Sequence, residues 1–260
     1  MSAEALRAYG RSMTTTDQAR AVLEDPRFLV PEAPAGGAAP GTMRWLRQSV
    51  ARFGNGAVHR RRRALAEAEL ARLDETVLRD RARELARTTA PDLAPYVPVA
   101  VLAEALGARG EIVPAVRAVA AAYQPGASDT AMARADDGVA TLMAGLPEGE
   151  PETVANLIGL LVQTCDATAA LIVNARRQGG SSAEEATALA LRHDPPVRAT
   201  RRTAARGAVL DGCPVAEGTE VPVDLTGGLA FGHGIRPCPG SRCALALAHG
   251  VLDVLLEESR

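Results

Sequence analysis

Apolar residues recur at helical spacing over most of this chain. The pattern predicts helices over residues 14–28, 45–53, 58–72, 74–88, 98–107 and 181–193, and two more within 111–144 on either side of a break at 125–129. Thr, Asp or Ser precedes several of these segments, and Pro or Gly ends them, as helix caps and stops do. The longest pattern, 150–178, contains an apolar stretch that Gln163 and Asp166 interrupt. It therefore predicts a buried helix and not a membrane span.

The pattern changes after residue 196. Residues 197–225 contain β-branched residues and the turn pairs Asp-Gly and Glu-Gly, which predict short strands and hairpins. An apolar helix is expected from about residue 241 to 258. The expected fold class is mainly α with a small β element late in the chain, arranged as one domain over residues 1–260.

Composition narrows the classes of function. The 260 residues carry a formal net charge of −2, which argues against nucleic acid or an anionic membrane as a partner. The first thirteen residues show no apolar signal region, and the four cysteines lack paired CxxC spacing. We therefore expect thiols in a cytoplasmic protein, without disulfides or a structural zinc site.

The stretch FGHGIRPCPG, residues 231–240, concentrates glycine and proline around Cys238. Gly232 and Gly234 permit positive φ or a close approach to a flat object, and the two prolines stiffen the loop. A helix that begins near Gly240 would stabilise a thiolate through its N-terminal N–H groups. The alternative is an ordinary strand-to-helix turn with a buried cysteine.

The whole pattern resembles the haem-binding loop of the cytochrome P-450 family, F-G-x-G-x-R/H-x-C-x-G. Its fixed positions are occupied by Phe231, Gly232, Gly234, Arg236, Cys238 and Gly240. The resemblance implies haem b as cofactor, Cys238 as its iron ligand and Arg236 as a partner of a haem propionate. It also implies a reduced cytochrome P-450-like fold.

Other segments extend the resemblance. DQARAVLEDPRF is similar to an early family segment, and LALRHDPPV to the family's helix and Pro-Pro turn before its small sheet. His59 and Arg63 match a propionate-binding pair four residues apart on one helix face, although a run such as HRRRR is also typical of a solvated basic face. Arg202 matches a further propionate position, and one residue of slip would give Arg201 instead.

The central helix departs from the family pattern A-G-x-D/E-T-T. Asp166 keeps the acid, but Ala167 replaces the alcohol that the family uses to supply protons during oxygen activation. The hydroxyls of Thr164 and Thr168 are the candidate replacements. A structural alternative makes Asp166 a buried acid with a local partner.

Two further departures concern structure. Arg192 keeps the arginine of the family's E-x-x-R motif, but Leu189 takes the place of the acid. The resemblance also implies that the family segment ahead of the cysteine loop is missing, so we expect Arg192 to be re-paired or exposed. It further implies that this chain lacks the family's first sheet strands.

Three functions fit these observations. The first is a haem-thiolate enzyme acting on a small biosynthetic substrate with altered chemistry, such as peroxide use or rearrangement. The second is an ordinary monooxygenase that takes electrons from a ferredoxin-type donor. The third is a non-catalytic accessory partner of a biosynthetic enzyme. A homo-oligomer remains open.

Overall fold

The computed structural model describes residues 15–123 and 126–257, so the N-terminal stretch without a signal pattern lies outside the described residues. Contacts divide the chain into two compact units, each described here by itself. The sheet unit consists of the described residues up to Pro31 together with Leu191–Cys238, and the helical unit consists of Glu32–Ala190 together with the described residues from Pro239 onward. The single domain over residues 1–260 stays a prediction.

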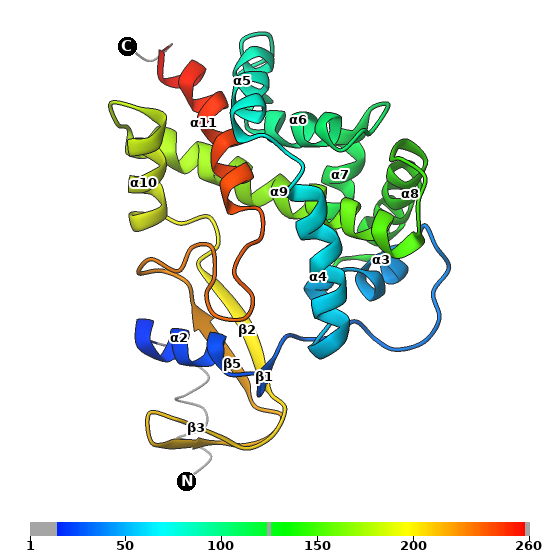
Figure 1. Cartoon of the computed structure of the whole chain (residues 1–260), viewed down its shortest axis with the longest axis vertical. Coiled ribbons are helices and arrows are strands. Elements are labelled where there is room, and N and C mark those ends of the chain that lie inside the picture. Colours follow the sequence, from blue (N-terminus) through cyan, green and yellow to red (C-terminus); the bar gives the residue numbers. More distant parts are fainter. Residues whose placement is uncertain (1–14, 124–125, 258–260) are drawn as a thin grey trace. The chain divides into compact units, whose positions relative to one another are not determined.

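The helical unit is built almost entirely from helices (Figure 1). Its elements are α3 (Met43–Ser49), η1 (Ala51–Phe53), α4 (Gly56–Leu70), α5 (Glu75–Ala86), η2 (Ala94–Tyr96), α6 (Val97–Ala105), α7 (Ile112–Ala121), α8 (Asp129–Gly145), α9 (Pro151–Gln178) and α11 (Ser241–Glu257). Helix α10 (Ala183–His193) begins in this unit and ends in the sheet unit. The expected mainly α class is confirmed.

Helix α9 forms the centre of the helical unit and contacts α4, α6, α7 and α11. Ile158, Leu161 and Ile172 on it are fully buried. Among the described residues, α9 is the one helix long and apolar enough to cross a membrane, but 67% of its apolar window is buried inside the structure. That burial agrees with the core helix expected from Gln163 and Asp166.

The predicted helix 45–53 is in fact two elements. Helix α3 ends at Ser49, Val50 is extended, and η1 follows. Asn156 of α9 fills the break, because its Oδ1 accepts from the Ala51 N–H at 3.2 Å and its Nδ2 donates to the Ser49 carbonyl at 3.2 Å.

The sheet unit combines one helix with short antiparallel strands. They are α2 (Thr16–Glu24), β1 (Phe28–Leu29), β2 (Ala199–Ala204), β3 (Ala208–Leu210), β4 (Cys213–Val215) and β5 (Glu220–Asp224). One sheet has the order β1-β2-β5, with Phe28 opposite Ala204 and Arg202 opposite Val221, and β3 pairs with β4 in a hairpin. The predicted late β element is therefore present, and β1 joins it from the early DPRF segment.

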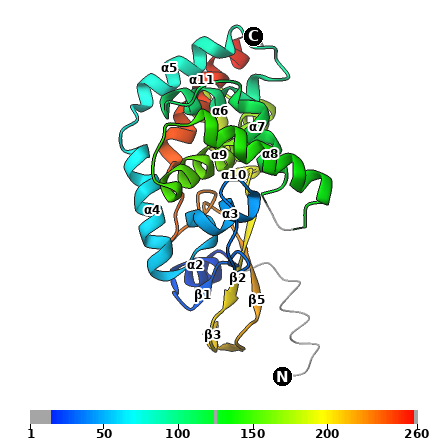
Figure 2. The ribbon, with the colours of Figure 1, turned by 90° about the vertical axis from the view of Figure 1, so that its right-hand side faces the viewer.

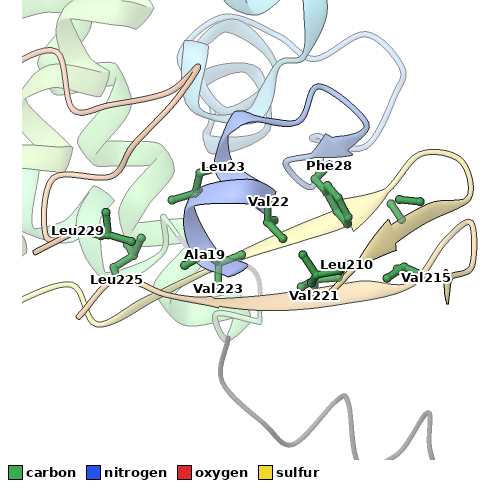
Figure 3. Packing of buried hydrophobic residues seen from close by; sticks show 12 residues of the cluster. Ala19, Val22, Leu23, Phe28, Leu210, Val215, Val221, Val223, Leu225 and Leu229 are labelled. Atoms are coloured by element: carbon green, nitrogen blue, oxygen red, sulfur yellow. The ribbon is translucent and has the colours of Figure 1, made fainter. Parts of the chain in front are cut away.

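The core of the sheet unit lies between α2 and the strands. Ala19, Val22 and Leu23 of α2 pack with Val221 and Val223 of β5, as Figure 3 shows. Thr15 caps α2 in a capping box with Gln18, which fixes where the helix begins. This core supports the cysteine loop that follows β5.

Candidate functional site

The cysteine loop, residues 231–238, is closed by its own backbone. The Cys238 N–H donates to the Phe231 carbonyl at 2.7 Å, and the Gly232 N–H donates to the Leu229 carbonyl at 2.7 Å. Cys238 itself is exposed, so the burial expected for an ordinary strand-to-helix turn is wrong. The loop therefore holds its shape while presenting a thiol at its surface.

Gly234 places the loop against the end of α2. Its φ is +65°, and a Cβ there would lie 2.5 Å from the Leu23 carbonyl oxygen, closer than any side chain allows. Around it, the Ile235 N–H donates to that same carbonyl at 3.3 Å, and His233 contacts Glu24 at 2.7 Å. The glycine is required because the two backbones meet at this point.

Gly232 serves the interior of the loop. Its φ is +74°, and a Cβ would lie 3.2 Å from the Arg236 carbonyl oxygen. Gly240, which follows the loop, belongs to the start of the next helix. Its carbonyl accepts from the Ala244 N–H at 2.8 Å, and this bond forms the first turn of α11. The helix start expected near Gly240 is therefore confirmed.

Two neighbouring arginines on β2 point in opposite directions. Arg202 is buried, with 6% of its surface exposed, and its guanidinium donates to Thr200 Oγ1 at 3.1 Å and to the Arg201 carbonyl at 2.9 Å. The Arg201 side chain is 71% exposed and lies 3.6 Å from Glu220. Alternation along the strand thus makes Arg202 the inward residue.

The sheet unit alone therefore offers the exposed thiol of Cys238 in the loop, together with the guanidiniums of the buried Arg202 and the half-buried Arg236. A thiolate is a suitable axial ligand for haem iron, and guanidiniums suit carboxylates such as propionates. Among the described residues, no group of three or more His, Cys, Asp or Glu forms an alternative metal site. This donor set fits a haem.

The basic run on α4 divides between several contacts. His59 is buried and shares a face with Arg63, whose Nε donates to Glu67 at 2.7 Å. Arg61 and Arg62 both contact Glu152 at 2.8 Å and, with Arg61 contributing most, lower the pKa of that carboxyl to about 2. The run is therefore more than a solvated face, since it joins α4 to the start of α9.

The middle of α9 shows the candidate proton-delivery residues. Asp166 is exposed, which excludes the interpretation as a buried acid. The Thr164 hydroxyl donates to the Leu160 carbonyl of its own helix at 2.9 Å, and Thr168 is 3% exposed. Cys165 is buried, and burial raises the pKa of its thiol to about 12.

The predicted site residues fall into two groups. Those in the sheet unit are Arg202, Phe231, Gly232, Arg236 and Cys238, and those in the helical unit are His59, Arg63, Thr164, Asp166, Thr168 and Gly240. The structure brings Phe231, Gly232, Arg236 and Cys238 together in one loop. That both groups serve one site stays a prediction.

Some residues that shape the loop were missed from sequence. Leu23 and Glu24 of α2 contact the loop through Ile235 and His233, yet nothing in the sequence of α2 signals those contacts. Arg192, deprived of its family partner, is exposed as expected.

Comparison with known proteins gives a fold and no more. No protein-family model matches the chain, and no curated protein matches it. P450BioI, solved with an acyl carrier protein carrying hexadec-9Z-enoic acid, is 18% identical with a TM-score of 0.75, over 93% of this chain and 83% of that one. The chain has the cytochrome P-450 fold. CalO2 is similar at 18% identity and TM-score 0.74, over 92% of this chain and 81% of that one.

A third solved structure broadens the comparison. A thermophilic cytochrome P-450 from Sulfolobus tokodaii is 17% identical with a TM-score of 0.70, over 92% of this chain and 84% of that one. The predicted cytochrome P-450-like fold is thus confirmed. Identities this low show a shared fold alone, and the chemistry depends on the residues of this chain.

Proposed function

We propose that this protein is a haem-thiolate enzyme of the cytochrome P-450 type that acts on a small biosynthetic substrate. The observation that carries the proposal is the cysteine loop: a closed backbone, two glycines at positive φ and an exposed Cys238. On a chain with the cytochrome P-450 fold, such a loop favours thiolate ligation of haem b over a packing role.

Each residue of the proposed site has a physical task. Cys238 would hold the iron as a thiolate, and Arg202, Arg236, Arg63 and His59 would donate to the propionates. When bound, the haem would supply oxidation chemistry at iron. Arg202 is the better candidate on β2, because Arg201 already faces solvent beside Glu220.

Within that class, we favour altered chemistry. Ala167 carries no hydroxyl, and the Thr164 hydroxyl is engaged by its own helix backbone at 2.9 Å. Asp166 is exposed to water, but Ala167, the residue directly after it, carries no alcohol. Peroxide use or rearrangement requires less from such residues than an ordinary monooxygenase with a ferredoxin-type donor does.

The substrate is proposed at the level of a class. P450BioI was solved in complex with an acyl carrier protein carrying hexadec-9Z-enoic acid, so a carrier-bound acyl chain should be included among the compounds tested. A cytoplasmic location and a homo-oligomer stay proposals.

An absorption spectrum tests the ligand. The purified chain, supplied with haemin, should give a thiolate-type spectrum when reduced under carbon monoxide. Cys238→Ser should abolish it, and Cys213→Ser, at the other exposed cysteine of the sheet unit, should leave it intact. A chain that stays colourless with haemin would overturn the enzyme proposals and favour the accessory partner.

A turnover comparison then divides the enzyme candidates. Product formed with peroxide but not with a ferredoxin and its reductase would support altered chemistry. The reverse result would support the ordinary monooxygenase.

A further inference from the structure

A pocket lies entirely within the helical unit, apart from the proposed haem-binding residues. Its volume is about 1020 Å³, and its walls come from α5, η2, α6, α7 and α8. Figure 2 shows the last three of these helices next to one another. Ligand pockets are commonly about 300–1,000 Å³, so this one is large enough for a whole small molecule. None of the proposed haem or proton-delivery residues lines it.

The pocket exists because its walls carry small side chains. Its lining includes Ala100 and Ala103 of α6, Ala118 and Ala121 of α7, and Ala131 of α8. Larger residues in this position would close the space. The lining also leaves apolar surface in contact with water, since Leu93 is 47% exposed. An apolar ligand would cover that surface favourably.

Two positive charges line the same pocket. The Arg117 guanidinium lies over the Tyr96 ring, 4.2 Å from its centroid, and Arg134 lines the pocket from α8. Neither arginine forms an ion pair among the described residues. The carboxylates in the lining are Glu104 and Glu111, and Glu104 is neutralised by Arg81 at 3.1 Å. Two cations therefore face one uncompensated carboxylate.

We propose that this pocket binds an amphipathic monocarboxylate with an apolar chain, separately from the haem site. The chain would cover the alanine-lined walls and Leu93, and the carboxylate would pair with Arg117. The contact with the Tyr96 ring restrains the Arg117 guanidinium, so less side-chain entropy remains to be lost on pairing. The inference does not depend on haem binding, because every residue in it belongs to the helical unit.

Titration calorimetry with dodecanoate tests the site on the purified full chain. We expect Arg117→Gln to weaken binding by about tenfold or more, the usual effect of losing a hydrogen bond to a charged group. Ala131→Phe fills the pocket without changing its charge and should also weaken binding. Arg176→Gln, an exposed arginine at the end of α9, is the matched control and should bind as the wild type does.

A ligand pair checks the chemistry of recognition. Dodecan-1-ol has the same chain without the charge and should bind at least about tenfold more weakly than dodecanoate. Equal affinities, no dodecanoate binding, or unchanged binding in both Arg117→Gln and Ala131→Phe would overturn the proposal. Arg117→Lys keeps the charge and provides a second arginine variant if the glutamine variant does not fold. If the lysine variant binds about as tightly as the wild type, recognition by charge is supported. If it binds dodecanoate as weakly as the wild type binds dodecan-1-ol, a specific requirement for the arginine guanidinium is supported.

Discussion

The cysteine loop of the sheet unit and the middle of α9 use their motif residues in different ways. In the loop, each motif glycine at positive φ meets a backbone carbonyl, and the Cys238 N–H closes the turn onto Phe231. In α9, Ala167 has no donor and Thr164 bonds to its own helix. The loop motif that would present a metal ligand is complete, while the helix motif that would deliver protons has Ala167 at its alcohol position.

Under the proposed function, this difference means that ligand presentation and proton delivery can be lost separately. A loop depends on backbone contacts, so a single wrong residue would deform it. A buried helix such as α9 keeps its shape whether or not one hydroxyl is present, because its packing residues remain. The helix can therefore lose chemistry without losing structure.

The largest expected effect comes from Gly234→Ala. The new Cβ would lie 2.5 Å from the Leu23 carbonyl oxygen at a φ of +65°, so the loop must move. We expect a loss of at least about 2 kcal/mol in the free energy of unfolding, together with most of the bound haem. Urea unfolding and haem content provide the two measurements.

Gly228→Ala is the matched control for that prediction. Gly228 also has a positive φ, +91°, but nothing lies within 4 Å of its would-be Cβ. The Gly228→Ala substitution should lower the free energy of unfolding by only about 1 kcal/mol. Equal losses in the two variants would show that contact with α2 is unimportant for the loop.

Next in size is the pair of neighbouring arginines on β2. Arg202→Gln should weaken haem binding about tenfold, because a buried guanidinium–carboxylate contact is worth roughly 1.5–3 kcal/mol. Arg201→Gln removes only an exposed ion pair and should change haem affinity by less than about twofold. Haem titration of both variants measures the difference, and a larger effect at Arg201 would reverse the assignment.

A smaller effect is expected from Glu152→Gln, which tests the structural half of α9. Hydrogen bonds from Arg61 and then Arg62 lower the pKa of Glu152 from 4.5 to about 2. Stabilisation by the carboxylate is thus complete above its ordinary pKa and is lost as the pH falls through about 2.

The Glu152 side chain is 29% exposed, so solvent screens its ion pairs. We expect them to contribute about 1 kcal/mol to the free energy of unfolding near neutral pH. Urea unfolding of Glu152→Gln and wild type should differ by that amount at neutral pH and converge in acid. A difference independent of pH would contradict the ion-pair explanation.

The smallest expected effect comes from Ala167→Thr. Restoring an alcohol after Asp166 should shift oxygen consumption from peroxide release towards product by a few-fold, since positioned proton donors act on the reacting group. Product and peroxide are measured together against total oxygen consumed. Thr168→Val is the comparison variant, and a shift as large there would place the relevant hydroxyl elsewhere. No shift in Ala167→Thr, with oxygen consumption established, would contradict the proton-delivery argument.

Local signals predicted much of the fold. The cap at Asp74, the glycine after α6 and the proline after α2 placed these helices within a few residues. The break at Val50 was missed because Asn156, which fills it, is distant in the sequence. Strand β1 was missed for the same reason, since its partner on β2 is the remote residue Ala204.

The candidate site was predictable in identity but not in arrangement. Cys238 and its glycines follow from the loop motif, whereas the choice between Arg201 and Arg202 needed the strand register. The engagement of Thr164 by its helix and the exposure of Asp166 depend on rotamer and packing, which spacing alone does not specify.

The contact between Gly234 and Leu23 has a consequence for biosynthesis. Residues Glu32–Ala190 of the helical unit lie between these two positions in the sequence. During translation, α2 is therefore synthesised long before the cysteine loop that packs against it. The ribosome has to synthesise the whole stretch between Leu23 and Gly234 before the loop can settle against α2. Cofactor loading through Cys238 would then be a late event, after translation has passed the loop.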